Sequence, residues 1–382
     1  MSLFSFMETL FWASIAFICY AYAGYPLLLL LMGLVRSRPV RKEVFQPTVS
    51  LIITAYNEER RMHDKLQNTL QLEYPRELLD VIVASDCSTD ATDEIVRSFE
   101  SSAVRLVRSD MKEGKEAAQK LAVESSAGEI LVFSDTATIL EPQAIATIVQ
   151  NFSDATVGCV SSVDRFIDVD GLVSGEGAYV RYEMWLRQLE TRVNTLVGLS
   201  GSFFAARRRV CLNWAPDLQS DFNTLLNSVR VGLRGVADPD SMGYYRNLAD
   251  QRKEYERKVR TVVRGISVFM RSLSLLNPVR YHLFAWQLFS HKLCRWLVPF
   301  AMIVALITNG VLAASSTFYR AILLVQAAFY TLALLYIVTQ RLPSVGMLHI
   351  PSFFVMVNVS ILDAWFRYFR GDRIFHWDPS KR

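Results

Sequence analysis

The sequence predicts an α/β domain, built on a mainly parallel sheet with helices on both faces, with transmembrane helices at both ends of the chain. Apolar runs alternate with amphipathic stretches through residues 48–165, which is the pattern of such a sheet. The 382-residue chain is 51% hydrophobic with a mean hydropathy of +0.21, and the apolar excess is concentrated at its two ends. The formal net charge is only +4, so the totals show no strong nucleic-acid-binding footprint. The five cysteines are scattered singly, which argues against a disulfide framework or a zinc site.

The first membrane segment runs from Thr9 to Val35 without a charged residue and is long enough to cross a hydrocarbon core of roughly 30 Å. No basic stretch precedes it and no small-residue cleavage site closes it, so we expect an anchor and not a signal peptide. Pro26 is expected to kink the helix without ending it. Basic residues follow at once, which places the next segment in the cytoplasm by the positive-inside rule: Arg36, Arg38, Arg41 and Lys42.

The central region predicts strands and helices in alternation. Strands are expected at Val49–Ile53, Leu79–Ala84, Val104–Val107, Ile130–Phe133 and Val157–Val163. Amphipathic helices are expected around Arg60–Gln71, Asp90–Phe99, Lys115–Ser125 and Gln143–Phe152. Neither a GxGxxG nor a GxxxxGK[ST] motif is present, so a standard dinucleotide fold or P-loop NTPase is unsupported.

The next segments predict a helix at Gly177–Arg192, a strand-like stretch at Leu199–Ala206 and a loop entering a helix at Asp217–Val231. Asp250–Arg264 is highly charged, as expected of a solvated helix face.

The C-terminal third predicts a second membrane region. Val279–Trp296 mixes aromatic and basic residues, as in a membrane interface. Leu297–Phe318 and Ala321–Gln340 are long enough to span, whereas Leu342–Leu362 is broken by prolines. Because the basic tail prefers the cytoplasm, three spans with a re-entrant or interfacial fourth segment are favoured over four spans.

The expected division of the chain follows from these patterns. It comprises a transmembrane helix (1–35), a basic linker (36–47), a cytosolic catalytic domain (48–270), interfacial helices (271–296), a membrane region with two spans plus a re-entrant or third span (297–366) and a basic cytosolic tail (367–382).

Polar residues collect where the predicted strands end. Asp135 ends the fourth strand, Asp86 ends the second, and Tyr56-Asn57-Glu58 follow the first. Lys115 follows Gly114 at a helix start, where a cation and free N–H groups suit a phosphate. Ligands collect at the carboxyl ends of strands in open α/β sheets, so these residues predict a nucleotide-diphosphate site. The alternative is that Asp135 caps the helix starting near Glu141-Pro142.

The segments VSLIITAYNEE, VIVASDCSTDAT, EGKEAA and FSDTAT, in this order and spacing, resemble the family 2 inverting glycosyltransferases of the A-type fold. The resemblance covers nearly the whole chain and continues through GEGAYVRYEMWLRQLE, GLSGSFFAARR, QSDF, ERKVR, SHKLCRW and the terminal HWDPSKR. Within that family the chain is similar to a membrane-anchored bacterial subgroup that makes cell-surface glycans or glycolipids.

The resemblance implies a role for each matching residue. Asp221 would be the catalytic base, and Asp135 would bind Mg²⁺ or Mn²⁺ as the acid of the DxD motif. The donor would be bound by Tyr56, Asn57, Glu58, Asp86, Lys115, Ser134, Asp135, Arg257 and Arg260. The acceptor would be bound by Gly201, Ser202, Ser220 and Phe222. The alternative for Asp221 is an N-cap of the helix that follows it.

Two positions depart from the family pattern. Ala137 stands at the second DxD position, where relatives usually carry Asp or Asn, so a metal would have one protein carboxylate nearby. Thr261 replaces the tryptophan of the QxxRW element, which removes an aromatic platform for a growing sugar chain.

The function expected from the resemblance is transfer of a single sugar from a nucleotide-sugar donor, UDP-linked, to a lipid-linked or cell-envelope glycan acceptor. The enzyme would lie in a bacterial inner membrane, with several spans and its catalytic domain on the cytoplasmic side, and would bind no nucleic acid. The alternatives are a processive polysaccharide synthase and a non-catalytic scaffold that has lost metal binding. A transporter is disfavoured because the spans carry no internal repeat or buried charge pair.

Overall fold

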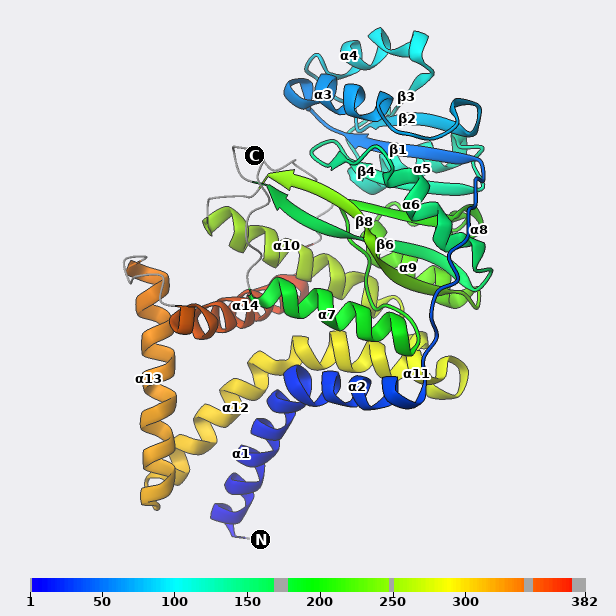
Figure 1. Ribbon diagram of the computed structural model, residues 1–382. Helices are drawn as coiled ribbons and strands as arrows, with labels where there is room; N and C mark the ends of the chain where they lie inside the picture. Colours follow the sequence, from blue (N-terminus) through cyan, green and yellow to red (C-terminus); the bar gives the residue numbers. More distant parts are fainter. Residues whose placement is uncertain (1, 168–177, 247–250, 340–345, 373–382) are drawn as a thin grey trace. The chain divides into compact units, whose positions relative to one another are not determined.

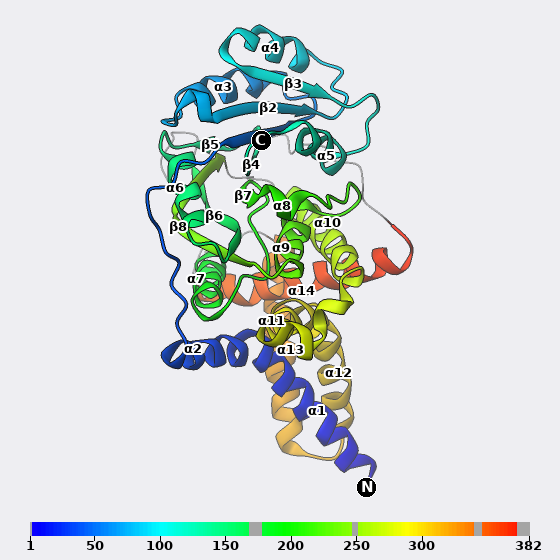
Figure 2. The ribbon, with the colours of Figure 1, turned by 90° about the vertical axis from the view of Figure 1, so that its right-hand side faces the viewer.

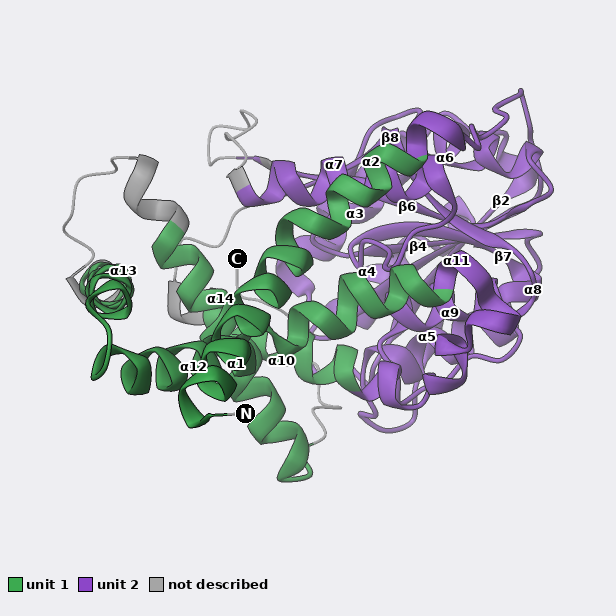
Figure 3. Cartoon of the chain, turned by 90° about the horizontal axis from the view of Figure 1, so that it is seen from below, with its two compact units in different colours: residues 1–32, 250–266, 285–373 green, residues 33–249, 267–284, 374–382 purple. Residues whose placement is uncertain are grey.

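The computed structural model describes residues 2–167, 178–246, 251–339 and 346–372. The chain divides into two compact units (Figure 3). The first comprises Met1–Met32, Asp250–Ile266 and Ala285–Arg373, and the second comprises Gly33–Ala249, Ser267–Phe284 and Ile374–Arg382. The terminal HWDPSKR segment lies outside the described residues.

The second unit is built on one mixed sheet (Figure 1). Within the described residues its strands follow the order β3-β2-β1-β4-β7-β6-β8-β5. Their bounds are β1 Val49–Ala55, β2 Leu79–Ser85, β3 Val104–Arg108, β4 Ile130–Asp135, β5 Ile139–Leu140, β6 Val157–Ile167, β7 Phe203–Arg207 and β8 Arg234–Arg246.

The first half of the sheet is parallel. β1 pairs in parallel with both β2 and β4, and β2 pairs in parallel with β3. All five predicted strands are present, each within a few residues of its expected bounds. The carboxyl ends of β1, β2 and β4 therefore meet at one edge, as the sequence predicted.

The second half of the sheet contains the strands that the sequence did not predict, β5 and β8. β7 pairs antiparallel with both β4 and β6, and β8 pairs in parallel with β6 (Figure 1). β8 contains Asp238-Pro239-Asp240, which by sequence rules indicates a turn. The structure accommodates these residues with a register shift, because Ala237 pairs with Ser161 and Met242 with Val163.

Helices cover both faces of this sheet, because alternate strand residues point to opposite sides. Leu51 and Ile53 of β1 pack in one cluster with side chains of α3 (Glu59–Leu70), α4 (Thr92–Ser98) and α6 (Ala144–Gln150). Ile52 packs in the other with side chains of α5 (Lys115–Ser125) and α9 (Ser220–Arg230). Figure 2 shows α3 and α6 on one side of the sheet and α5 on the other. Further segments of this unit are the helix α7 Ala178–Val193, the short helix α8 Arg208–Cys211 and the 3-10 turns Arg76–Leu78, Glu100–Ser102, Asn151–Ser153 and Leu273–Leu276.

The first unit is helical in its described residues. Its helices include α1 Leu3–Cys19, α12 Arg295–Ala313, α13 Thr317–Thr339 and α14 Gly346–Phe369, while α2 Tyr25–Val35, α10 Gln251–Met270 and α11 Pro278–Leu288 each belong partly to the other unit. A π-helical turn, Tyr20–Gly24, joins α1 to α2. Pro26 lies just after this turn, inside the continuous helical segment Leu3–Val35, so the prediction that it does not end the helix is confirmed.

Three helical segments of the described residues are long and apolar enough to cross a membrane: Leu3–Val35, Pro278–Ala313 and Thr317–Leu335. The predicted interfacial stretch after Val279 is continuous with the span that follows it, through a second π-helical turn at Phe289–Cys294. Tyr20 and Ser290, one in each π turn, are hydrogen-bonded at 2.6 Å. The re-entrant or interfacial role of the fourth apolar segment stays a prediction for α14.

We expect Gly128→Ala to destabilise the protein, because β4 approaches β1 too closely there for a side chain. A Cβ at Gly128 would lie 2.4 Å from the Ser50 backbone N and 2.8 Å from the Val49 carbonyl carbon. Backbone atoms cannot rotate away, so the strands must separate at a cost of about 1–3 kcal/mol. The thermal unfolding midpoint of the purified full chain should fall. Gly310→Ala is the control, since no atom lies within 4 Å of its Cβ, and an equal midpoint for both variants would contradict this packing.

Candidate functional site

Asp135 ends β4 at the predicted edge of the sheet and lies in an ion pair. Its Oδ1 is 2.5 Å from Nζ of Lys115, the first residue of α5. The same ammonium donates to the Gly201 carbonyl at 3.2 Å, and the Asp135 backbone N–H donates to the Ser202 carbonyl at 2.9 Å. Asp135 does not cap the following helix, because α6 starts at Ala144 and its N-cap is Gln143. The capping alternative is therefore wrong.

Asp86 at the end of β2 fixes the turn that carries Lys115. Its carboxylate is fully buried and accepts backbone N–H groups of Glu113 at 2.9 Å and Gly114 at 3.0 Å. Gly114 has φ +106°, a backbone conformation that residues other than glycine rarely adopt. Asp86, Lys115 and Asp135 are thus joined by consecutive contacts across β2, α5 and β4.

The loop after β1 holds three of the residues predicted to bind the donor: Tyr56, Asn57 and Glu58. Asn57 has φ +51°, and its Oδ1 accepts the Thr89 backbone N–H at 2.8 Å. Glu58 is buried and forms an ion pair with Arg61 at 2.9 Å. Burial raises the pKa of Glu58, and the Arg61 guanidinium opposes this shift. Lys112 Nζ lies 3.9 Å from the centre of the Tyr56 ring.

Asp221 lies in the first turn of α9, close to the loop that Lys115 contacts. The N-cap of α9 is Gln219, so the alternative role of Asp221 as the N-cap is wrong. Its Oδ1 accepts the Phe222 backbone N–H at 2.7 Å, and its Oδ2 accepts from Gln219 Nε2 at 3.1 Å. A Cβ on Gly201 would be only 2.8 Å from Asp221 Oδ2. The segment at Gly201 therefore lies beside the predicted base and is hydrogen-bonded to Lys115 and Asp135.

Lys65, on α3, is a site residue that the sequence analysis missed. Its side chain is 3% exposed, and Nζ donates to Ser134 Oγ at 2.8 Å and to the Thr138 carbonyl at 2.6 Å. Burial lowers the pKa of Lys65 to about 7, and the nearby Asp135 carboxylate opposes this shift. The sequence did carry a signal, because the spacing of Met62, Lys65, Leu66 and Thr69 places them on one helix face.

Asp164, on β6, is a second residue that the sequence analysis missed. Its Oδ1 accepts the Ser200 hydroxyl at 2.6 Å and also the Ser202 hydroxyl. Desolvation raises the pKa of Asp164, while the two serine hydrogen bonds and Arg187 oppose this shift. Asp164 thus holds the segment of Gly201 from the far side. No motif in the sequence marked this residue.

The remaining predicted site residues differ in accessibility. Ser134, Ser220 and Phe222 are buried, and Ser134 bonds to Lys65. Arg257 and Arg260 lie on the part of α10 that belongs to the first compact unit, so their donor-binding role stays a prediction.

The residues offer limited support to a divalent cation. Among the described residues, no group of three or more His, Cys, Asp or Glu side chains is arranged to hold a metal ion. The Asp135 side chain is 32% exposed and its Oδ1 is paired with Lys115, while Ala137 supplies no ligand. A hard cation fits here only where donor phosphate oxygens complete its coordination.

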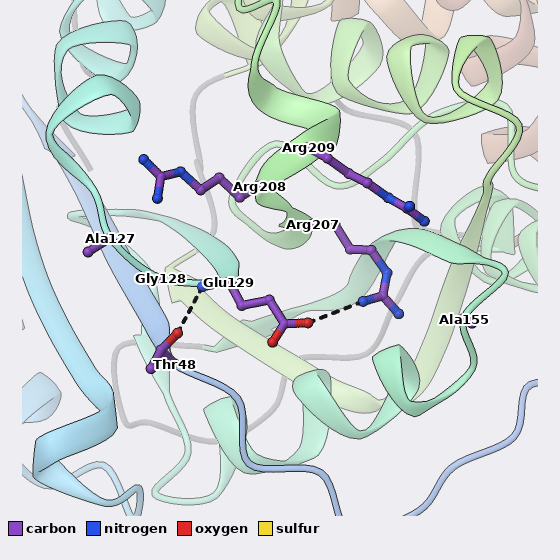
Figure 4. Close-up of a pocket in the computed structure, with 8 residues that line it drawn as sticks. All are labelled: Thr48, Ala127, Gly128, Glu129, Ala155, Arg207, Arg208 and Arg209. Atoms are coloured by element: carbon purple, nitrogen blue, oxygen red, sulfur yellow. Dashed lines mark hydrogen bonds and ion pairs between the residues drawn. The ribbon is translucent and has the colours of Figure 1, made fainter.

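A pocket of about 520 Å³ lies at the other edge of the sheet (Figure 4). Its lining includes Thr48, just before β1, and Gly128 and Glu129, just before β4. Arg207 faces Glu129 at 3.5 Å, whereas Arg208 and Arg209 extend in different directions. Because it adjoins the amino ends of β1 and β4, this pocket is separate from the site around Asp135.

Comparison with known proteins gives matches across the chain. Residues 50–213 match the model of glycosyl transferase family 2. A beta-monoglucosyldiacylglycerol synthase of Nostoc sp. is 25% identical over 203 residues, 50% of this chain and 43% of that protein. A poly-beta-1,6-N-acetyl-D-glucosamine synthase of Staphylococcus epidermidis is 22% identical over 178 residues, 44% of this chain and 42% of that protein. The chain thus spans less than half the length of either relative.

A solved structure resembles the fold over nearly the whole chain. A mannosyltransferase from Pyrobaculum calidifontis, in complex with GDP-Man and Mn²⁺, has a TM-score of 0.75 at 22% identity, covering 95% of this chain and 99% of that chain. This similarity and the family match confirm the predicted A-type glycosyltransferase fold.

We expect the stability difference between wild type and Lys65→Met to depend on pH. Because the folded-state pKa of about 7 lies below the ordinary 10.5, the unfolded chain binds more protons between these values. Wild type should therefore gain stability relative to the variant as pH rises from 7 towards 10, by on the order of a few kcal/mol. Thermal unfolding at a series of pH values measures this. The control Lys120→Met, with a side chain 44% exposed, should show no such trend; a pH-independent difference for Lys65→Met would contradict the shift.

Proposed function

We propose that this chain, which contains a glycosyl transferase family 2 domain at residues 50–213, transfers a single sugar from a nucleotide-sugar donor with inversion of the anomeric configuration. One observation carries the proposal: Gly201 accepts a hydrogen bond from Lys115 of the Lys115–Asp135 pair and lies beside the Asp221 carboxylate. A donor diphosphate bound at the Lys115–Asp135 pair and an acceptor hydroxyl bound at Asp221 would then lie on either side of the anomeric carbon.

In the proposed mechanism, different residues neutralise the charge of the leaving group and accept the proton of the acceptor hydroxyl. Departure of the nucleoside diphosphate builds negative charge, which the Lys115 ammonium neutralises after it exchanges Asp135 for a phosphate oxygen. Mg²⁺ or Mn²⁺, held by Asp135 with donor phosphate oxygens, would supply further positive charge there. The acceptor hydroxyl is a poor nucleophile, so Asp221 takes its proton as the new bond forms. Attack opposite the leaving group gives inversion.

The donor is proposed to be a UDP-sugar, with GDP-sugars as the nearest competitor. By the family resemblance Asp86 would hydrogen-bond a uracil-type base, and here its carboxylate accepts backbone N–H groups of Glu113 and Gly114. The similar mannosyltransferase structure was solved with GDP-Man. Both nucleotide classes therefore belong in the first screen.

The acceptor is proposed to be a lipid-linked or cell-envelope glycan at the cytoplasmic face of a bacterial inner membrane. Three helices long and apolar enough to span support membrane association, and the basic residues after Val35 favour a cytoplasmic catalytic domain. The similar Nostoc protein is named as a glycolipid synthase, and the Staphylococcus protein as a polysaccharide synthase. Thr261, in place of the QxxRW tryptophan, favours transfer of one sugar over a processive synthase.

Transfer assays with purified protein test this function. With UDP- and GDP-sugars, Mn²⁺ and a lipid acceptor, Asp221→Asn should retain nucleotide binding but lose transfer by roughly 10²–10⁴-fold, because the base is gone. Asp135→Asn should weaken nucleotide binding as well. The products should carry one added sugar. Full activity in both variants would remove the site assignment, and a wild type that binds nucleotide without transfer would favour the scaffold alternative.

Gly201→Ala should lower the transfer rate without weakening binding of the nucleotide donor. Its new Cβ would meet Asp221 Oδ2 at 2.8 Å, so the carboxylate must shift away from the acceptor. Misplacement of this size is expected to reduce kcat by roughly 10- to 100-fold. Steady-state kinetics and nucleotide titration separate the two effects. Gly310→Ala, on α12 with open space around its Cβ, is the control and should leave kcat unchanged. Equal kcat in both variants would mean that Gly201 does not constrain the base.

A further inference from the structure

Burial of the Lys65 ammonium group costs folding free energy. Its ammonium is 3% exposed and donates to two neutral acceptors, Ser134 Oγ and the Thr138 carbonyl. A buried ammonium without a directly bonded carboxylate loses hydration that neutral acceptors only partly replace. The two acceptors lie on either side of Asp135, so Lys65 bridges the turn that carries the acid.

The turn does not need a charge to be fastened to α3. Three residues further along α3, Asn68 makes a reciprocal pair with Leu140: Nδ2 donates to the Leu140 carbonyl at 2.8 Å, and Oδ1 accepts the Leu140 N–H at 2.9 Å. A neutral amide thus fastens the end of the same segment at no cost of buried charge. Attachment of the turn to α3 therefore does not explain why a charged side chain is buried at position 65.

The charge balance around Asp135 provides the explanation. Ala137 removes the second acid of the DxD pair, and Lys115 on α5 is paired directly with Asp135, while Lys65 on α3 lies behind the turn. The Glu58 and Asp164 carboxylates also act on Asp135 through space, so the added positive charge of Lys65 offsets a negative surrounding. A nucleoside diphosphate brings at least two negative charges to this edge. In a poorly solvated interior, a fixed charge acts on a ligand that it does not touch more strongly than it would through water.

We propose that Lys65 is a positioning residue of the donor site. From behind the turn it holds Asp135 in place through Ser134 and Thr138 and adds positive charge that selects a diphosphate over ligands of lower charge. The inference rests on the proposed function, because it needs a nucleotide donor. It assigns to Lys65 no contact with the ligand.

The test compares nucleoside diphosphate with monophosphate, since a charge effect grows with ligand charge and a purely structural one does not. UDP and UMP, and GDP and GMP, are titrated calorimetrically into the full detergent-purified chain at pH 6.5, with EDTA and again with Mn²⁺. The variants are Lys65→Met, Lys65→Gln, which keeps a donor without charge, and Lys65→Arg, which keeps the charge. The matched control is Asn68→Ala, which loosens the same segment without changing charge.

We expect Lys65→Met and Lys65→Gln to weaken diphosphate binding about tenfold and monophosphate binding about threefold or less, on the scale of one lost charge interaction. Lys65→Arg should retain a diphosphate-to-monophosphate affinity ratio near that of wild type, and Asn68→Ala should lower both affinities equally. An unchanged ratio in Lys65→Gln, or an equal loss of the ratio in Asn68→Ala, overturns the inference. If wild type binds neither UDP nor GDP, the proposed function falls and this inference falls with it.

Discussion

The geometry of the candidate site depends on the ion pair between Lys115 and Asp135. It joins the start of α5 to the end of β4, and the same ammonium reaches the Gly201 carbonyl. Each partner has its own support: Asp86 fixes the turn before Lys115, and Lys65 bridges the turn around Asp135. A salt bridge that is mostly withdrawn from water holds its geometry only when such neighbours satisfy the surrounding polar groups. The pair therefore sets the spacing between the donor side and Asp221.

Most of the fold was predictable because buried strands and amphipathic helices leave regular patterns. The apolar run at Val49–Ile53 and the helix at Lys115–Ser125 were expected where the structure has them. β8 was not expected, because Pro239 reads as a turn when only the local sequence is considered. Its long pairing with β6 supplies the tertiary contacts that override this local signal, and a register shift absorbs the proline.

The candidate site was predictable only in part, for a different reason. Strand-end acids such as Asp86 and Asp135 follow apolar runs, so their common edge could be inferred from the parallel sheet alone. Asp164 lies inside β6 and enters the site only because β7 brings Ser200 and Ser202 beside it. Such a contact depends on antiparallel pairing between distant segments, which no local pattern encodes. Lys65 was visible as a lysine on an apolar helix face, but its partners on the β4–β5 turn were not.

The missing second acid has a consequence for how the site handles charge. A second acid at position 137 would add negative charge beside Asp135, and a cation would have to offset it together with the diphosphate. With Ala137 that acid is absent while Lys65 and Lys115 both remain beside Asp135, so part of the offset is built into the protein. Because Lys65 is buried behind the turn, a rotamer change cannot move its ammonium group out to solvent or onto Asp135. The loss of one ligand position is thus compatible with a nucleotide-diphosphate site, provided that the buried lysine keeps its charge when the ligand arrives.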